Sequence, residues 1–293
     1  MPLPLPTIEV GSQPSPRAGL LTAAVGPMDI GDVHVTTAGA QYEAEACTDD
    51  RLYPTACRDV PYDTFVYDAR EALRTVYAFN VYASEICTPV GTSLAEAHAR
   101  VNRRLVLGEQ TAVEKGLWGG NGSNVVGIFE QMQASGLITA VGGTAGPVES
   151  LSLLEQTAAG LYDGRVNIHA RPRMAAYFAA RGLIYTGARR TGEKTDLSYT
   201  QLGSEYVFGA GYAGSSPAGV APDATTETVY ATGRILMWRS GVVSPGEGMP
   251  HVDPLLNRTT NQRAIFALRT YAIAVECFAA AVTVTRGTSE IIP

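Results

Sequence analysis

Few residues of this chain have types and spacings that could do catalytic or metal chemistry. The four histidines are His34, His98, His169 and His251, and none has a second histidine or a cysteine at ligand spacing. His169 lies in a buried-looking strand and is the best acid–base candidate, although a hydrogen-bonded structural imidazole is the commoner arrangement. The histidines therefore predict no metal site.

The four cysteines contain no Cys-x-x-Cys pair, which also disfavours a zinc site. Cys87 and Cys277 lie in apolar runs, and we expect them to be buried thiols. Cys47 and Cys57 flank a polar turn, and they either form a disulfide or stay as two free thiols in a reducing cytosol.

The common catalytic motifs are absent from the sequence. Gly214–Ala218 fails the Gly-x-Ser-x-Gly nucleophile pattern at its last position. Gly119–Gly122 follows a helix, whereas a dinucleotide site needs a preceding strand and a different spacing. We therefore predict no catalytic, cofactor-binding or metal-binding residues, no cofactor, and a protein that is not an enzyme.

The charge distribution argues against a specific nucleic-acid site. The formal net charge is −6, and 17% of residues are charged against 45% hydrophobic, which suits a subunit that hides much of its surface in contacts. Arg100, Arg103 and Arg104 form a small basic cluster, but Glu96 is placed for an i,i+4 ion pair with Arg100. A solvated or intersubunit face is favoured there.

The elements that position these residues begin with a strand. Residues 73–87 are strand-like, with Phe79 and Val81 on one side, and with Tyr82 and Ile86 helping to fill the other. This pattern suits a strand that is covered on both faces, at least in part.

One long helix follows the strand. Ser93 and Glu96 form a capping-box pattern, which predicts the start of a helix. Glycines at 116, 119 and 120 predict its end, after roughly 24 residues. Its apolar stripe is expected to contain Leu94, Ala97, Val101, Leu105, Gly108 and Ala112.

The N-terminal part of the chain has no helical period. Residues 1–19 contain five prolines and form either a disordered tail or an extended arm on another surface. Strand signals follow at Val33–Thr37 and around Tyr42–Ala46, with a turn at Ala38–Gly39. Such a ribbon is marginal alone and should lean on something else.

The middle of the chain mixes helices and strands. A helix or strand is expected around 125–132, inside the glycine-rich passage 119–146. Helices are predicted from Pro147 to Asp163–Gly164 and from Pro172 to Arg181–Gly182. Strands are predicted at 166–170, 199–208 and 228–238, and residues 209–226 are predicted to be an exposed loop.

The C-terminal part predicts two strands joined by a bend. Residues 264–275 are a long strand candidate, because their β-branched and aromatic content favours a strand over a helix. Residues 276–280 form the bend, and 281–285 return.

This order of parts resembles the major capsid proteins of tailed bacteriophages, which have the Hong Kong 97 fold. Tyr77–Trp118 looks like the strand and spine helix of that fold, and Asn261–Gly287 resembles its closing strands. The runs Thr92–Val101 and Arg269–Val275 are similar to capsid proteins of phages that infect actinobacteria. The resemblance covers nearly the whole chain.

The resemblance implies an α+β fold with five parts. Residues 1–29 would be the N-terminal arm and 30–70 an extended β-ribbon loop that lies across a neighbour. Residues 71–145 and 255–293 would form the peripheral domain, and 146–254 the axial domain. The loop 30–70 has no lysine, so lysine–asparagine crosslinks are not expected there.

The resemblance also implies a virion protein that assembles in the bacterial cytoplasm into an icosahedral shell around double-stranded DNA. Its partners would be copies of itself in hexamers and pentamers, a portal, scaffolding or decoration proteins, and DNA contacted non-specifically. No membrane partner is expected, because the N-terminus has no secretory pattern and no apolar run reaches about 18 residues.

Two other functions remain open from the sequence. One is an encapsulin-type compartment of the same fold, which would enclose a protein cargo. The other is a cytosolic hydrolase or small-molecule binding protein with a pocket between the helix pair 148–181 and the sheet.

Overall fold

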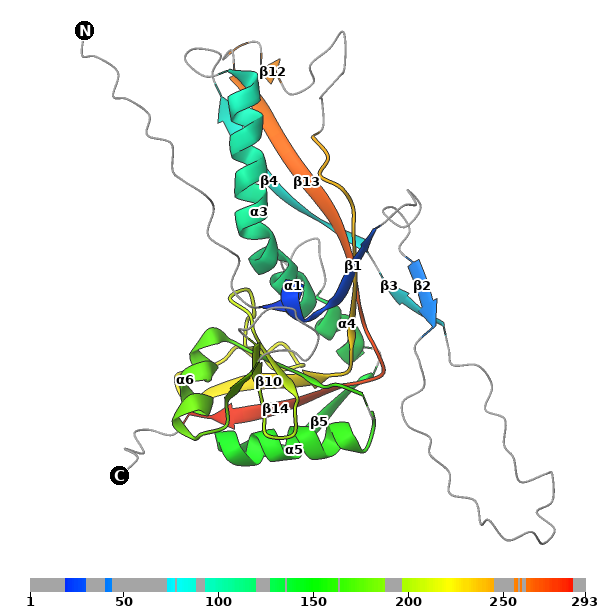
Figure 1. Cartoon of the computed structure of the whole chain (residues 1–293), viewed down its shortest axis with the longest axis vertical. Coiled ribbons are helices and arrows are strands. Elements are labelled where there is room, and N and C mark those ends of the chain that lie inside the picture. The colour runs from blue at the N-terminus through cyan, green and yellow to red at the C-terminus, as the bar shows by residue number, and fades with distance from the viewer. Residues whose placement is uncertain are drawn as a thin grey trace, which may run out of the picture.

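A computed structural model describes twelve parts of the chain: residues 19–29, 40–43, 73–76, 78–87, 93–119, 127–134, 136–162, 164–187, 197–244, 256–257, 259 and 262–286. Within them, one long helix stands against a five-stranded sheet, and a seven-stranded sheet with shorter helices lies below it (Figure 1). Predictions that fall on Val33–Thr37, Cys47 and Cys57 lie outside the described residues.

The long helix α3 spans Leu94–Trp118, and its predicted capping box is confirmed. The Ser93 hydroxyl accepts from the Glu96 amide at 3.2 Å, and the Glu96 carboxylate accepts from the Ser93 amide at 2.9 Å. The predicted end of the helix is confirmed at Gly119, which is the C-cap, whereas Gly116 lies inside the last turn. Gly116 instead allows close packing, since a Cβ there would lie 2.6 Å from the Phe79 ring.

The buried face of α3 follows a row of residues at four-residue spacing. The predicted stripe was right at Ala97, Val101 and Leu105, but Leu94 and Gly108 are exposed. The row continues toward the C-terminal end of the helix with residues that were not predicted. Its members are Ala97, Val101, Leu105, Glu109, Val113 and Leu117.

Strand β13, Gln262–Val275, forms the middle of the five-stranded sheet and confirms the predicted long strand. It pairs antiparallel with β4, Ala78–Cys87, from Arg263↔Cys87 to Ala272↔Ala78. On its other side it pairs with β11, Ile235–Arg239, and with β12, Leu256–Asn257.

The N-terminal segment joins the same sheet. Helix α1 spans Leu20–Ala23, and strand β1, Val25–Asp29, pairs parallel with β11. Leu20 is fully buried. Strands β2, Ala40–Glu43, and β3, Leu73–Val76, form a separate antiparallel pair, so the predicted strand at Tyr42 is confirmed.

The seven-stranded sheet has the order β5-β14-β10-β6-β9-β8-β7. The predicted strands 199–208 and 228–238 are each divided, the first by a turn at 200–204 and the second by Gly233, and their halves are separate strands. Strand β5 was not predicted. The strand bounds are β5 Ile138–Ala145, β6 Asn167–Ala170, β7 Tyr185–Gly187, β8 Leu197–Tyr199, β9 Glu205–Phe208, β10 Thr226–Thr232 and β14 Ala279–Thr285.

Three further helices lie in the part of the chain that the structure describes: α4 Ile128–Ala134, α5 Pro147–Ala159 and α6 Pro172–Ala180. The last two confirm the predicted helices, although α5 ends before the predicted Asp163–Gly164 stop. The space between α5, α6 and the sheet is filled by one apolar cluster, which includes Leu151, Leu154, Ala158, Ile168, Met174, Phe178 and Val282.

Two crossings of the chain between the sheets lie side by side. One is Gly233, between β10 and β11, and the other is the bend at 276–278, between β13 and β14. The Glu276 amide donates to the Arg234 carbonyl at 2.9 Å, and the Glu276 carboxylate accepts two bonds from the Arg234 guanidinium and one from the Tyr162 hydroxyl. Cys277 in this bend is buried as expected, but it is disulfide-bonded, so the prediction of a free thiol was wrong.

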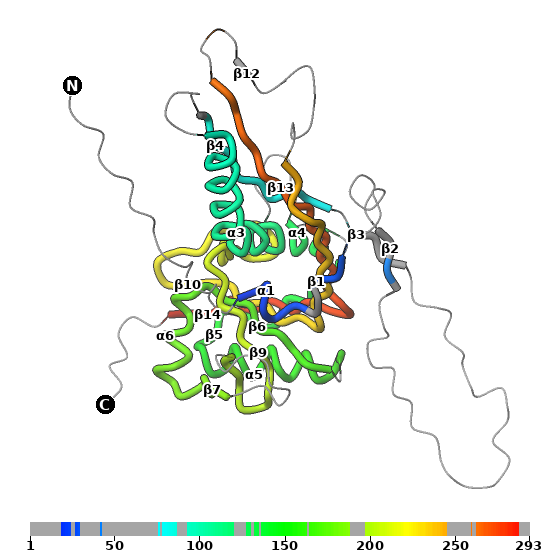
Figure 2. The backbone as a smooth tube through the Cα atoms, turned by 45° about the horizontal axis from the view of Figure 1, so that its top comes forward, coloured from blue at the N-terminus to red at the C-terminus, as the bar shows by residue number. Residues whose placement is uncertain are grey.

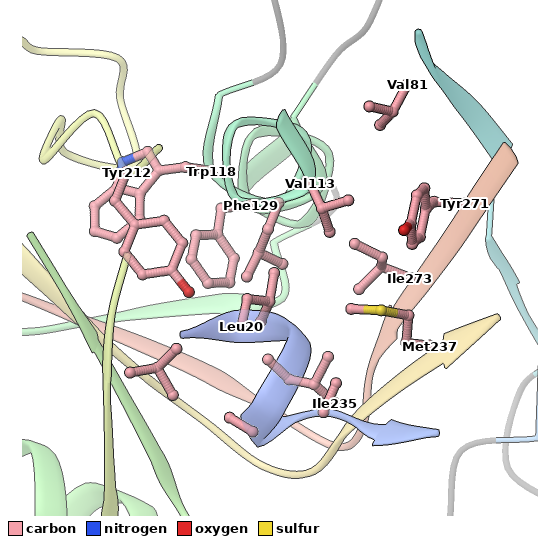
Figure 3. Packing of buried hydrophobic residues seen from close by; sticks show 14 of the residues in the cluster. Leu20, Val81, Val113, Trp118, Phe129, Tyr212, Ile235, Met237, Tyr271 and Ile273 are labelled. Carbon is pink, nitrogen blue, oxygen red and sulfur yellow. The ribbon is translucent and has the colours of Figure 1, made fainter. Parts of the chain in front are cut away.

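The largest core cluster lies where α1, α3, α4 and both sheets meet (Figures 2 and 3). Figure 3 shows Trp118, Phe129 and Tyr212 on one side of Leu20, and Ile235, Met237 and Ile273 on the other. The Phe129 and Tyr230 rings stack with centroids 4.4 Å apart, and the Trp118 ring meets Tyr230 edge-on. This core joins the segments that position the buried polar groups described below.

Candidate functional site

His169, the best acid–base candidate of the sequence analysis, is a fully buried structural residue on β6. Its Nδ1 lies 2.9 Å from the Tyr212 hydroxyl, and its Nε2 lies 2.9 Å from the Thr232 hydroxyl. Burial lowers its pKa to about 3, so the ring stays neutral at physiological pH. With both nitrogens occupied and no route to solvent, the ring is not placed to act as a general base.

The other histidine in the described part of the chain, His98, is half-buried near the start of α3. The described residues contain no group of three histidine, cysteine or acidic side chains that could hold a metal ion. Within the same residues, no helix is long and apolar enough to cross a membrane.

The basic cluster on α3 is used to hold the helix on the sheet. Arg100 donates to Glu85 of β4 at 2.8 and 3.1 Å, and Arg104 lies 3.1 Å from the same carboxylate. The Glu96 carboxylate bonds the Ser93 amide, and the predicted interaction with Arg100 is electrostatic only, as one of the smaller causes that lower the Glu96 pKa. The tertiary strand offers Arg100 a half-buried carboxylate, which holds it better than an exposed helix neighbour.

Two buried carboxylates lie farther along α3, and neither was predicted from the sequence. Glu109 accepts from Arg269 at 2.7 Å and from the Tyr271 hydroxyl at 3.0 Å, which ties the helix to β13. Glu114 is fully buried and accepts from backbone amides of Leu20 and Gly211. Acidic residues on an apolar helix face gave the only local signal for them.

The loop 209–226, predicted to be exposed, is buried at its start. Tyr212 is 3% exposed and packs on Trp118 with ring centroids 4.8 Å apart. The Trp118 indole donates to Ser215. Farther along, Glu227 lies buried beside Arg171 and Arg173, whose guanidinium groups compensate its charge. The prediction failed because glycine-rich composition reports backbone freedom and not burial.

One sheet face stays open to solvent. Tyr82 and Ile86 of β4 are 67% and 69% exposed, so the prediction that both faces of this strand are filled was wrong. They sit opposite Leu268 and Ala264 of β13, on the side away from α3. Val243, 51% exposed, bridges Leu268 from the other edge. We call Tyr82, Ile86, Val243, Ala264, Phe266 and Leu268 the open face.

The lower end of the same sheet side is covered by the β2–β3 pair. Val76 of β3 packs with Ala272 and Ala274 of β13, and the Tyr42 hydroxyl donates to the Val275 carbonyl at 3.1 Å. The open face therefore continues a surface that is covered elsewhere by a ribbon of the same chain. The sequence could not separate the covered residues from the open ones, because both sets are apolar and alternate in the same way.

No protein-family model matches the chain, and no curated protein is significantly similar to it in sequence. Solved structures match it over nearly its whole length. A chain from the capsid of a native GTA particle is 11% identical over 96% of this chain and 100% of its own, with a TM-score of 0.51.

Two further structures have TM-scores below 0.5. A chain of Mycobacterium phage Adephagia is 15% identical, with 96% of each chain covered and a TM-score of 0.48. The SrpI encapsulin of Synechococcus elongatus PCC 7942 is 14% identical, with 94% of this chain and 92% of its own covered and a TM-score of 0.47. On the match to the GTA particle capsid, this chain has the α+β fold of the Hong Kong 97-type capsid proteins.

Proposed function

We propose that this chain is the major capsid protein of a tailed bacteriophage and assembles into an icosahedral shell around double-stranded DNA. The observation that carries the proposal is a fold shared with the GTA particle capsid from one end of that chain to the other. The chain would act in the virion, after assembly in the host cytoplasm from hexamers and pentamers, together with a portal and with scaffolding or decoration proteins.

The surface of the subunit supports a role in contacts between copies. The open face exposes the large apolar side chains of Tyr82, Ile86 and Val243 beside half-buried residues of β13, and exposed apolar patches on proteins mark sites that another surface covers. A net charge of −6 suits a shell that contacts DNA without gripping it, because each basic contact to a phosphate would strengthen binding.

The described residues support a mechanical role over an enzymatic one. The buried titratable groups are held by hydrogen bonds or ion pairs inside the fold, as for His169 and Glu109. A hydrolase or small-molecule binding protein would need a pocket between the helix pair and the sheet, and this region is filled by apolar side chains.

We also propose the division of the subunit. Helix α3 and the five-stranded sheet would form the peripheral domain, and the seven-stranded sheet with α5 and α6 the axial domain. Residues 1–29 would serve as the arm and 30–70 as the extended loop. Sheet membership supports placing β5 and β14 with the axial domain and β11 with the peripheral domain.

The first test is assembly of the full-length chain, alone and with its neighbouring virion genes. We expect closed particles by sedimentation and electron microscopy, and nuclease-protected DNA in particles purified from a phage lysate. A chain that stays monomeric or dimeric under all these conditions contradicts the proposal. Particles that hold a protein cargo and no DNA would support an encapsulin-type compartment instead.

A second test uses the open face. The double variant Tyr82→Ser/Ile86→Ser should keep the melting temperature of the unassembled subunit, because both side chains are mostly exposed, and should reduce particle yield at least tenfold. Leu107→Ser is the matched control, since Leu107 is 58% exposed on α3. Equal yields for the double variant and the wild type would show that this face is not a contact between copies.

A further inference from the structure

Glu114 differs from the other buried carboxylates of the described residues in the groups that surround it. Glu109, Glu205, Glu227 and Glu276 each lie beside an arginine. Glu114 is fully buried, and within the described residues it forms no ion pair. Its carboxylate is compensated by backbone amides that come from two segments far apart in the sequence, and by the Gln110 side chain one turn earlier on α3.

The first segment is the N-terminal one. The Leu20 amide donates to Glu114 Oε1 at 3.4 Å, and Leu20 itself is buried in the main core. Gly19 lies so close to α3 that an added Cβ would be 2.2 Å from Gln110 Nε2 and 2.7 Å from Glu114 Oε1. An alanine at this point would therefore force the ends of the Gln110 and Glu114 side chains to move.

The second segment is the loop between β9 and β10. The Gly211 amide donates to Glu114 Oε2 at 2.9 Å. An added Cβ at Gly211 would lie 2.2 Å from the Thr111 carbonyl oxygen and 2.8 Å from Glu114 Cβ. Two segments thus press against the same turn of α3, and each covers one oxygen of the same carboxylate.

We propose that Glu114 couples the docking of residues 19–24 to the docking of residues 209–212, so that loosening either segment loosens the other. When both segments are docked, water is excluded and each amide bond to the carboxylate is strong. If one segment leaves, water reaches the exposed oxygen and competes for the remaining bond, while part of the charge compensation is lost. The coupling is reciprocal, as any coupling free energy between two sites must be.

The titratable side chain that faces Glu114 from the loop is Tyr212, and His169 lies behind it at 2.9 Å. Residues Leu20–Ala23 of α1 carry no titratable group, and Lys115 on α3 points to solvent. Tyr212 and His169 are both neutral at physiological pH, so neither supplies a positive charge that could replace the two amides. This inference does not depend on the capsid function, because it concerns contacts within one subunit.

The test is hydrogen–deuterium exchange by mass spectrometry on the full-length chain, read in peptides that cover 19–24 and 209–212. Gly211→Ala should displace the loop and also speed exchange at 19–24 by about tenfold, within the range typical of coupled sites. Gly19→Ala should speed exchange at 209–212 by a similar factor. Gly143→Ala on β5 is the matched control, because an added Cβ there meets nothing within 4 Å.

The role of Glu114 is tested by repeating both glycine changes in a Glu114→Gln background. Glutamine keeps one acceptor and turns an NH₂ group toward the other amide, so the effect of each glycine change on the distant segment should disappear. Glu109→Gln, a buried carboxylate on the same helix, should leave that effect in place. Protection of β13 peptides reports whether each variant is folded.

Two results would overturn the proposal. In the first, Gly211→Ala and Gly19→Ala each change exchange only in their own segment, with the distant peptide within twofold of the wild type. In the second, the distant effect persists in the Glu114→Gln background, which would show that other core contacts carry the coupling.

Discussion

Two buried groups at the lower end of α3 respond to pH in opposite directions. Burial lowers the pKa of His169 to about 3, and burial raises the pKa of Glu114 despite the hydrogen bonds from Gly211 and Leu20. As pH falls below about 6.5, His169 is protonated in the unfolded chain but stays neutral in the folded chain. The free energy of unfolding therefore falls. Glu114 works the other way, because its contribution is present at low pH and is lost as pH rises through its folded pKa.

We predict that His169→Gln makes stability less sensitive to acid. Between pH 6.5 and pH 3 the wild-type histidine contributes a loss of up to about 1.4 kcal/mol per pH unit, which a neutral glutamine cannot. The variant should be less stable than the wild type at pH 7.5, because the fit between Tyr212 and Thr232 is disturbed, and the gap should narrow at pH 5.5.

The measurement is urea unfolding of the unassembled full-length chain at the two pH values. His98→Gln, the same change at a half-buried position on α3, is the matched control for the substitution itself. If the gap between His169→Gln and the wild type is the same at both pH values, the histidine does not control acid sensitivity.

At the scale of elements, α3 is held along its whole length by contacts of different chemistry. The capping box fixes its start, Glu85 binds Arg100 and Arg104 in the first half, and Glu109 binds Arg269 in the middle. Gly116 then lets the Phe79 ring of β4 approach the helix backbone. The helix is therefore fixed to the sheet at several levels and not at one hinge.

Two glycines of α3 should respond differently to alanine. Gly108 is exposed and an added Cβ meets nothing within 4 Å, so Gly108→Ala should stabilise the chain by about 0.5–1 kcal/mol through helix propensity. Gly116→Ala should destabilise it by about 1–2 kcal/mol, because overpacking against Phe79 outweighs the same propensity gain. Thermal melts of the two variants provide the measurement, and equal stabilisation by both would mean that the Phe79 contact is loose.

At the scale of the whole molecule, the two sheets are joined by two chain crossings that lie side by side and by one shared core. The Gly233 crossing and the bend at 276–278 are hydrogen-bonded to each other, and Arg234 and Tyr162 both bind Glu276. Trp118 and Tyr230 sit between the sheets in the shared core. The two sheets are therefore held together by packed side chains and not by a single linker.

We predict that the mature shell is not covalently crosslinked through lysine. The sequence has two lysines, Lys115 on α3 and Lys194, and residues 30–70 have none. Boiled virions on a reducing denaturing gel should show one band near 30.9 kDa. A ladder of multimers that survives reduction would contradict this prediction, and a ladder that collapses on reduction would point to cysteine instead.

Local chemistry made several elements predictable. Ser93 and Glu96 place a helix start with neighbouring atoms only, and Pro147 and Pro172 do the same for two more helices. The β-branched and aromatic run at 264–275 gave a long strand for a similar local reason. Boundaries were less predictable, because Gly116 ends nothing when a ring must pack against it.

The helix caps, the long strand and the lack of local catalytic motifs could be predicted from the sequence, because each depends on residues only a few positions apart. Tertiary structure alone decided which apolar residues are buried and which acidic residues are paired. Arg100 donates hydrogen bonds to Glu85 of a distant strand, Glu114 accepts from the amides of Leu20 and Gly211, and Tyr82 is exposed. Each of these outcomes depends on distances between segments that only packing brings together. Residue type and spacing along the chain do not predict those distances.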